Sequence, residues 1–311
     1  MLVHDGIVYC AAGRSSYLDG GIRLCRLDVK TGRLLSETPI DDRDPQTGYQ
    51  RKGVVHGTNM PGALPDILSC DGESIYMRHA RFDLKGEPQA PDVAHLFSAA
   101  GFLDDTWWHR TYWLVGTAMG TNYGGWPRVG NQVPAGRLLV LDDSFVYGFG
   151  RNQYIHHGAH VGIDGATIFH YKPNRDAQRR FTYYQAFAIE RESSAGDRQQ
   201  AKRARQYRWT QQLPVLTRAM VLAGDTLLLA GPPDIFSSDL SRLGRAKTDE
   251  PAAALEGGKG GLLIVVSAGK GRKLAQYDLD SPPIFDGMAA AHGRAYLATV
   301  DGSVVCLCPD K

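Results

Sequence analysis

Three histidines, His156, His157 and His160, fall within five residues. Neutral imidazole binds Zn, Cu, Fe or Ni, and the nearby Asp164 adds a carboxylate. Adjacent histidines in an extended chain point to opposite sides, so a metal site would need a further ligand from a distant part of the chain. The pattern is typical either of a metal site at His156, His157 and His160 or of a solvated loop.

Four of the five tryptophans fall between residues 107 and 126, among charged and hydroxyl side chains. A flat ring beside an arginine is typical of sugar or peptide recognition, because the ring covers apolar area while the polar neighbours fix orientation. Large aromatic side chains also pack in the core between sheets, and we expect core positions for most of residues 107–113. Gly124 and Gly125 allow a backbone to approach a ligand closely. The predicted ligand-binding residues are Trp126, Arg128, Tyr123, His109 and Arg110.

Charge gives little reason to expect a polyanionic partner. The chain has 311 residues, with 35 Lys and Arg against 33 Asp and Glu, which is a formal net charge of +2. The basic run Lys202–Trp209 is short, whereas a nucleic-acid surface normally shows as a basic face of the whole domain. We therefore interpret this run as a solvated loop and expect no nucleic-acid partner. No apolar run approaches the roughly 20 residues that cross a bilayer, so we expect no transmembrane segment.

Familiar catalytic motifs are missing from the sequence. There is no glycine-rich phosphate loop and no Gly-x-Ser-x-Gly elbow, so nucleotide and acyl-transfer chemistry have no support. Five cysteines are an odd number in a large domain, and no Cys-x-x-Cys pair occurs, so we predict neither a disulfide framework nor a zinc site built on cysteines. No cofactor is expected.

A tight turn followed by an aromatic-tipped strand recurs along the chain and must position any site. Its copies are Asp5–Tyr9, Asp71–Tyr76, Asp104–Trp108, Asp143–Tyr147, Asp164–Phe169, Gly224–Leu228 and His292–Tyr296. One such hairpin cannot bury its own apolar face, so each copy must stack on its neighbours. The first repeat contains four short antiparallel strands, which is the blade pattern of a β-propeller. We predict one all-β domain over residues 1–311, a β-propeller of six or seven four-stranded blades with irregular insertions.

The later repeats can be placed from their alternating apolar residues and turn signals. The expected strand regions are Ile67–Leu84, Leu96–Gly116, Arg137–Gln153 with Phe181–Glu190 and Gln206–Leu213, then Ala219–Ala230 with Leu262–Ser267 and Lys273–Leu279, and Met288–Leu307. The expected insertions are a loop at Asp41–Ala63, a surface excursion at Arg191–Arg205, and Gly231–Lys259 with a short helix near Asp239–Arg245.

Residues Leu27-Asp28-Val29-Lys30-Thr31-Gly32-Arg33 carry a family resemblance. They resemble the repeat signature of the pyrroloquinoline-quinone-like, or quinoprotein-like, β-propellers, and degenerate copies follow at Val266–Leu274 and Asp286–Leu307. The resemblance implies the propeller fold over most of the chain and suggests a bacterial, extracytoplasmic protein. The same repeat serves dehydrogenases and outer-membrane assembly scaffolds, so it does not fix an activity.

The chain departs from the quinone-dependent dehydrogenases of that family at two places. The family's vicinal cysteine pair is missing, and Arg33 stands where the dehydrogenase repeats have tryptophan after the threonine-glycine turn. We therefore predict a non-catalytic binding or scaffolding propeller with a polysaccharide or protein partner. The alternative is a carbohydrate-active propeller that binds a polysaccharide or cleaves it as a lyase. A quinone-dependent dehydrogenase is a third and weaker reading.

The ends of the sequence give two further expectations. The chain enters a strand at once, without a charged and apolar leader, so we expect no export signal in this sequence, and the compartment is left open. The last repeat reads as three strands, so we expect an exposed edge around Val304–Leu307, weak self-association, or a natural protein that continues before Met1 and supplies the missing strand.

Overall fold

In the computed structural model, the regular secondary structure of the described residues is almost entirely β-strand. The structure describes residues 1–49, 63, 67–78, 80–90, 93–98, 113–117, 133–152, 160–161, 167–168, 184–191, 207–235 and 249–308. One short helix, α1 (Asp249–Leu255), is found in these ranges. None of the helical residues described there forms a segment long and apolar enough to cross a membrane.

The first sheet shows how local sequence sets the repeat. Its strands β1 (Leu2–His4), β2 (Ile7–Ala12), β3 (Ile22–Asp28) and β4 (Leu34–Ile40) pair antiparallel in chain order. Asp5 and Gly6 both have positive φ, 45° and 75°, which is the type I′ geometry that matches strand twist. At the next turn the carboxylate of Asp28 accepts hydrogen bonds from the backbone nitrogens of Lys30 and Thr31 at 3.1 and 2.8 Å. The predicted four-stranded meander is confirmed.

Five further antiparallel meanders follow in the described residues, three with four strands and two with three. The second contains β5 (Leu68–Cys70), β6 (Ser74–Met77), β7 (Ala80–Asp83) and β8 (Pro88–Gln89); the third contains β9 (His95–Ser98), β10 (Trp113–Gly116) and β11 (Ala135–Gly136). The fourth contains β12 (Leu138–Leu141), β13 (Phe145–Arg151), β16 (Tyr184–Glu190) and β17 (Tyr207–Gln211). The fifth contains β18 (Ala219–Ala223), β19 (Thr226–Gly231), β20 (Gly261–Ser267) and β21 (Lys273–Leu279). The sixth contains β22 (Pro283–Ala291), β23 (Arg294–Thr299) and β24 (Val304–Leu307), and β14 (His160–Val161) pairs with β15 (Thr167–Ile168).

Six successive antiparallel meanders are the blade arrangement of a β-propeller, as predicted. The sixth sheet has three strands in the described residues, also as predicted, although β22 begins at Pro283 rather than at Met288. The helix expected near Asp239–Arg245 lies outside the described residues. The helix that is described, α1, comes later in the same insertion.

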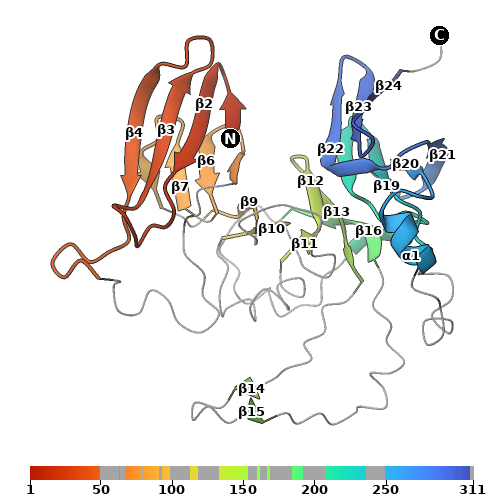
Figure 1. Cartoon of the computed structure of the whole chain (residues 1–311), viewed down its shortest axis with the longest axis horizontal. Coiled ribbons are helices and arrows are strands. Elements are labelled where there is room, and N and C mark those ends of the chain that lie inside the picture. Colours follow the sequence, from red (N-terminus) through yellow and green to blue (C-terminus); the bar gives the residue numbers. More distant parts are fainter. Residues whose placement is uncertain are drawn as a thin grey trace.

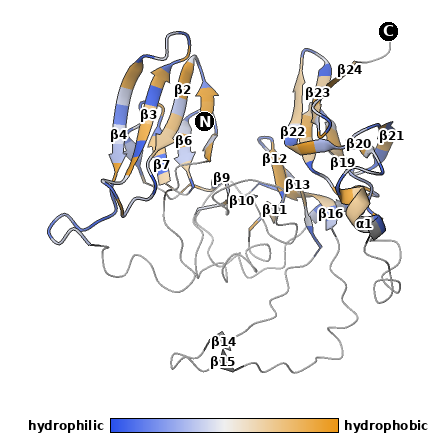
Figure 2. Ribbon diagram, viewed as in Figure 1, coloured by the Kyte–Doolittle hydropathy of each residue, from blue (hydrophilic) through white to orange (hydrophobic). Residues whose placement is uncertain are grey.

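The core lies between consecutive sheets. Tyr9, Ile22 and Leu24 of the first sheet pack against the second, and the largest core cluster joins the fourth and fifth sheets. Within that cluster the indole nitrogen of Trp209 donates to the Ala268 carbonyl at 2.7 Å. Apolar residues therefore gather on the strands in Figure 2, while polar ones fill the turns. This pattern arises because each strand sends alternate side chains toward a neighbouring sheet.

The two ends of the strands differ. Short turns such as Asp5–Gly6 and His292–Gly293 join strands at one end, which is uppermost in Figure 1. At the other end are the longer connections, among them residues 13–21 and the connection from β19 to β20 that contains α1. We call this second end the loop end. Functional residues usually occupy such loops on a rigid β-scaffold.

Candidate functional site

The candidate site begins at a β-bulge in β22. The pairing of β22 with β23 shifts between Pro283 and Met288, which leaves Ile284–Gly287 outside the regular ladder. Asp286 adopts a φ of 57°, and its backbone nitrogen donates to the Arg218 carbonyl at 2.8 Å. Bulges re-aim side chains and are frequent beside binding sites, while a left-handed non-glycine residue must be held by its surroundings. The bulge is therefore a defined local structure that the surrounding residues hold in place.

Arg137 connects this bulge to the fourth sheet. It stands directly before β12, and its side chain is buried, with 1% of the residue exposed. Its guanidinium carbon lies 5.4 Å from the ring centroid of Phe285. That distance is within the range of a cation–π contact, which strengthens when the cation is desolvated. The buried guanidinium group of Arg137 therefore packs against the partly exposed ring of Phe285.

Tyr184 and Arg151 lie beside Arg137. They are directly opposite each other in the register of β13 and β16, and the Tyr184 ring stacks on Phe149 with centroids 5.5 Å apart. The pKa of Tyr184 is raised, because burial outweighs two opposing influences. These are the charge and hydrogen bond of Arg151 and the charge of Arg137. The phenol is therefore neutral at physiological pH and remains both a hydrogen-bond donor and an acceptor.

Arg218 fixes the other side of the bulge. It stands directly before β18, is largely buried, and donates from Nη2 to the Leu255 carbonyl at 2.5 Å. Leu255 is the last residue of α1, and cationic groups stabilise exposed carbonyls at a helix end. Arg218 therefore holds α1 and, through its own carbonyl, the bulge at Asp286.

We call the six residues Arg137, Arg151, Tyr184, Arg218, Phe285 and Asp286 the loop-end cluster. Asp286 keeps solvent-accessible area, yet the protein atoms around it desolvate the carboxyl group and raise its pKa. The cluster brings three arginines, one carboxyl group and the partly exposed Phe285 ring to the loop end, with the Arg137 guanidinium against that ring, so it favours an anionic group placed beside an apolar one. Clustered titratable groups with a perturbed pKa are markers of functional sites.

A second buried polar group, at the second and third sheets, has a structural role. The His95 imidazole is 3% exposed and stacks on Tyr76 with centroids 3.8 Å apart. Its two ring nitrogens lie 2.8 Å from the carbonyls of Val93 and Arg78. Tyr76 in turn donates to the Asp71 carboxylate at 2.6 Å. This chain of contacts joins the end of β6 to the start of β9.

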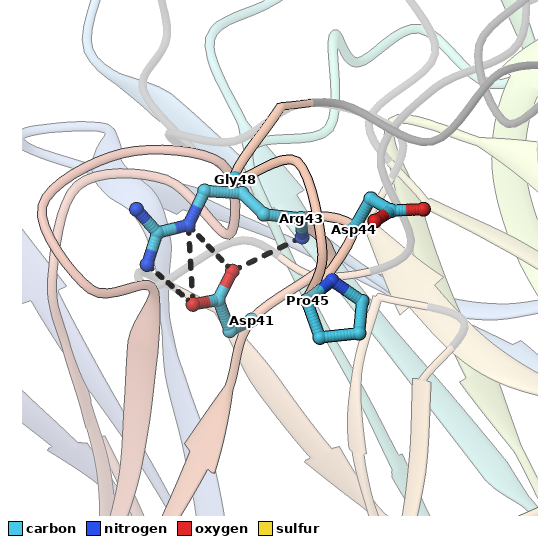
Figure 3. Close-up of a pocket in the computed structure, with 5 residues that line it drawn as sticks. All are labelled: Asp41, Arg43, Asp44, Pro45 and Gly48. Atoms are coloured by element: carbon cyan, nitrogen blue, oxygen red, sulfur yellow. Dashed lines mark hydrogen bonds and ion pairs between the residues drawn. The ribbon is translucent and has the colours of Figure 1, made fainter.

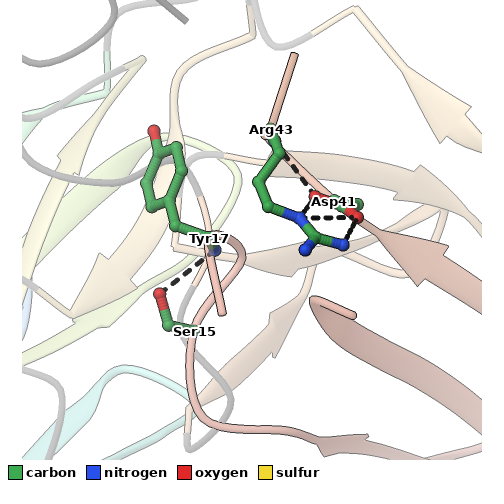
Figure 4. A network of polar contacts seen from close by, with 4 residues as sticks. All are labelled: Ser15, Tyr17, Asp41 and Arg43. Atoms are coloured by element: carbon green, nitrogen blue, oxygen red, sulfur yellow. Dashed lines mark hydrogen bonds and ion pairs between the residues drawn. The ribbon is translucent and has the colours of Figure 1, made fainter. Parts of the chain in front are cut away.

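A hollow in the surface is lined by Asp41, Arg43, Asp44, Pro45 and Gly48 (Figure 3). The Arg43 guanidinium binds the Asp41 carboxylate through Nε and Nη2, and the shortest distance is 2.6 Å. Figure 4 shows this pair near Tyr17, whose backbone nitrogen donates to Ser15. The hydrogen bonds and charge of Asp41 raise the pKa of Arg43. Because the two charges satisfy each other, the hollow is a weaker candidate than the loop-end cluster.

None of the predicted site residues belongs to the loop-end cluster. The predicted ligand-binding residues Trp126, Arg128, Tyr123, His109 and Arg110 lie outside the described residues, as do His156 and His157. The backbone of His160 pairs in β14, but its side chain is not described. No group of three potential metal ligands occurs in the part of the chain that the structure describes. These predictions therefore stay untested.

The sequence contains one pattern that indicates part of the loop-end cluster. Arg137 and Arg218 each stand one residue before the first strand of a sheet, so they occupy the same position in two repeats. Equivalent arginines in successive repeats meet at one end of a stacked array. The contribution of Tyr184 and Phe285 depends on side-chain packing across sheets and has no sequence signature.

Comparisons with known proteins add little to this geometry. No family model and no curated protein matches the chain. Among solved structures, BamB from Moraxella catarrhalis aligns with a TM-score of 0.33 and 11% identity, covering 97% of this chain and 79% of that one. Dihydro-heme d1 dehydrogenase NirN, in complex with DHE, aligns with a TM-score of 0.30 and 12% identity, covering 97% of this chain and 60% of that one. Similarity at this level says nothing about activity, so the fold assignment rests on the sheets themselves.

Proposed function

We propose that the chain is a binding module without catalysis of its own, and that its partner is a protein segment carrying an acidic side chain beside an apolar one. The loop-end cluster supports this proposal. Ile284 is exposed and the Phe285 ring is exposed in part, so they supply apolar area. Half-exposed Arg151 offers a guanidinium group for a carboxylate, the kind of pairing that arginine makes with two parallel hydrogen bonds.

The observation that carries the proposal is the contact between Arg137 and Phe285. It joins the fourth and sixth sheets at the loop end with the arginine fully buried, so the ring is held in one position before a ligand arrives. A preorganised aromatic group beside a cation binds with a smaller entropy loss than a mobile one. The predicted polysaccharide alternative depends on Trp126, Arg128 and the histidine loop, which lie outside the described residues.

Peptide binding tests the proposal. A panel of fluorescent peptides, each with one Asp or Glu next to Leu or Phe, is titrated against the protein and followed by anisotropy. We expect salt-dependent binding, which Arg151→Gln weakens about tenfold, as for loss of a charge-assisted hydrogen bond. The control is Arg33→Gln, which removes an exposed arginine near a tight turn at the opposite end. Equal binding of lysine-containing peptides, or a loss with Arg33→Gln alone, would contradict the proposal.

A further inference from the structure

Two cysteines of the first sheet stand opposite each other on neighbouring strands. Cys10 on β2 pairs with Cys25 on β3 in a regular antiparallel register. Residues that are paired in this way send their side chains to the same side of the sheet. The other side, which carries Tyr9 and Leu24, packs on the second sheet. Both thiols therefore lie on the side away from the second sheet, and both are half-buried.

The backbone hydrogen bonds between β2 and β3 indicate how far apart the two cysteines are. The Val29 nitrogen donates to the Gly6 carbonyl at 3.0 Å, so Gly6 and Val29 form a hydrogen-bonded pair of the ladder. Such pairs recur at every second residue, which makes Cys10 and Cys25 another one. The Cα atoms of a hydrogen-bonded pair lie about 5.5 Å apart, which is within the usual range for disulfides. A bond between the two sulfur atoms therefore leaves the strand pairing intact.

The two thiols are also in contact. Burial is the main cause that raises the pKa of Cys25, and the neighbouring Cys10 adds to it through its charge and through a hydrogen bond between the two side chains. Glu37, opposite Cys25 on β4, raises this pKa as well, whereas Arg23 lowers it. Arg23 and Glu37 form an ion pair with each other. The Cys25 thiol is therefore protonated at neutral pH.

The other cysteines have no such partner. All five lie within the described residues and are free thiols. Cys70 stands opposite an isoleucine of β6, Cys306 stands opposite a tyrosine of β23, and Cys308 follows the last strand. The strand register therefore brings one pair of cysteines together, Cys10 and Cys25.

We propose that Cys10 and Cys25 form a reversible disulfide by exchange with the disulfide of a small thiol, and that this bond restrains the connection between β2 and β3. The Cys10 thiolate attacks one sulfur of the small disulfide, which releases one small thiol and leaves a mixed disulfide on Cys10. Cys25 then loses its proton and attacks the Cys10 sulfur, and the second small thiol leaves. The two cysteines thus lose two electrons and two protons, which the oxidant gains as two thiols.

The order of the two steps follows from the surroundings of Cys25. Its raised pKa leaves little thiolate, so it is a poor first nucleophile. In the second step it attacks from a position directly opposite Cys10, where its local concentration is high. The reverse reaction is open as well, because small thiols can reach a half-exposed disulfide.

The bond closes a covalent loop around the whole connection between β2 and β3, residues 13–21. This connection belongs to the loop end and contacts the segment after β4, where the Asp42 nitrogen donates to the Ser16 carbonyl at 2.9 Å. A cross-link reduces the entropy of the opened state, so local opening becomes rarer. Oxidation therefore makes this part of the loop end more rigid.

Peptide mapping tests the bond. The full chain is equilibrated in buffers with a rising ratio of oxidised to reduced glutathione, quenched with acid, alkylated and digested with trypsin without reduction. Trypsin cuts after Arg14, Arg23 and Arg26, so the bond joins peptides 1–14 and 24–26 into a product two hydrogen atoms lighter than their sum. We expect this product to grow with the ratio and to disappear in reduced glutathione. Its absence at every ratio would overturn the proposal.

Two serine variants test the assigned steps. Cys25→Ser has no second thiol, so we expect glutathione to stay attached to Cys10. Cys70→Ser is the matched control and should form the joined peptide as the native chain does. A joined peptide missing from Cys70→Ser would overturn the assigned pair. Faster attachment of glutathione to Cys25 in Cys10→Ser than to Cys10 in Cys25→Ser would overturn the order of the steps.

Limited proteolysis of the folded chain tests the restraint. The Arg14 side chain is 72% exposed and lies inside the closed loop. We expect cleavage after Arg14 to be about tenfold slower in the oxidised chain than in the reduced chain. Cleavage after the exposed Lys270, in a turn of the fifth sheet, is the internal reference and should not change. Cys10→Ser should cleave at one rate under both conditions. Equal rates in the oxidised and reduced native chain would overturn the proposed effect on the connection.

Discussion

At the scale of single residues, the structure repeats one device that the sequence suggests only in part. The carboxylates of Asp71 and Asp142 each cap a tight turn and also accept from a tyrosine five residues further along, Tyr76 and Tyr147. The turn-plus-aromatic repeat predicts the position of these tyrosines. It does not predict the hydroxyl contact, because two side chains must reach past the turn toward each other. These hydrogen bonds therefore depend on how the side chains pack and cannot be predicted from the repeat pattern.

These two tyrosines should be among the last of the described tyrosines to ionise during an alkaline titration. Burial is the main cause that raises the pKa of Tyr76 and of Tyr147 to about 12, and the aspartate partner adds to it. The raised pKa stabilises the fold below pH 10, and that contribution is lost as pH rises from 10 to about 12. Ultraviolet absorbance of phenolate should show Tyr76 and Tyr147 among the last tyrosines to ionise. Asp71→Asn should shift one of them partly downward and leave the other, whereas an unchanged titration would contradict the assignment.

His95 should make stability depend on pH in the acid range. Burial, the largest influence, lowers the pKa of His95, although the Val93 and Arg78 carbonyls oppose this shift. The folded state therefore prefers the neutral ring, and stability is lost as pH falls from about 6.5, the unfolded value, through the lower folded pKa. Urea unfolding between pH 7 and 5 should show a steeper loss for the native chain than for His95→Gln. Parallel slopes for the two proteins would argue against this role.

At the scale of elements, glycine placement shows where the sheets come closest. Gly271 has a φ of 68°, and a Cβ added there would meet the Trp209 ring at 2.5 Å. The turn that holds it is recognisable in sequence as the degenerate second copy of the family repeat. Its closeness to Trp209, which belongs to the preceding sheet, is not recognisable, because that contact depends on how two sheets stack.

Gly271→Ala should therefore destabilise the joint between the fourth and fifth sheets. The added methyl group clashes with the indole and forces an L residue into the left-handed region, which together cost roughly 2–4 kcal/mol. Gly269→Ala in the same turn is the matched control, because nothing lies within 4 Å of its added Cβ. Thermal unfolding followed by tryptophan fluorescence compares the two. Equal midpoints would show that the ring moves aside without cost.

At the scale of the whole molecule, the sequence predicts the strands well but does not predict the loop-end cluster. Period-two alternation and glycine turns placed the strands of the first, fourth and fifth sheets within a few residues. The sequence does not reveal the loop-end cluster, because Arg137 and Tyr184 of the fourth sheet meet Phe285 only when the sixth sheet comes beside the fourth. The residue pattern within a short segment determines whether that segment forms a strand. The stacking of sheets that are distant in sequence determines which side chains lie on the same surface.

We also expect that the chain does not bind pyrroloquinoline quinone. The vicinal cysteine pair is missing from the sequence, and the residue after the threonine-glycine turn is Arg33 rather than tryptophan. The test is calorimetric titration of purified protein with the quinone and calcium, paired with a dye-linked alcohol oxidation assay. Saturable tight binding together with dye reduction would refute the expectation.

The stacking of sheets also has a consequence for how the protein unfolds. Among the described residues, each inner sheet packs against the sheets before and after it, whereas the first and sixth sheets each pack against one. In a stack with two terminal sheets, opening begins at those sheets and moves inward, so amide hydrogens of β3 and β23 exchange sooner than those of β13 and β19 only when the sheets do not close into a ring. A ring has no ends from which to open. The spread of exchange rates along the chain therefore reports how cooperatively the six sheets melt.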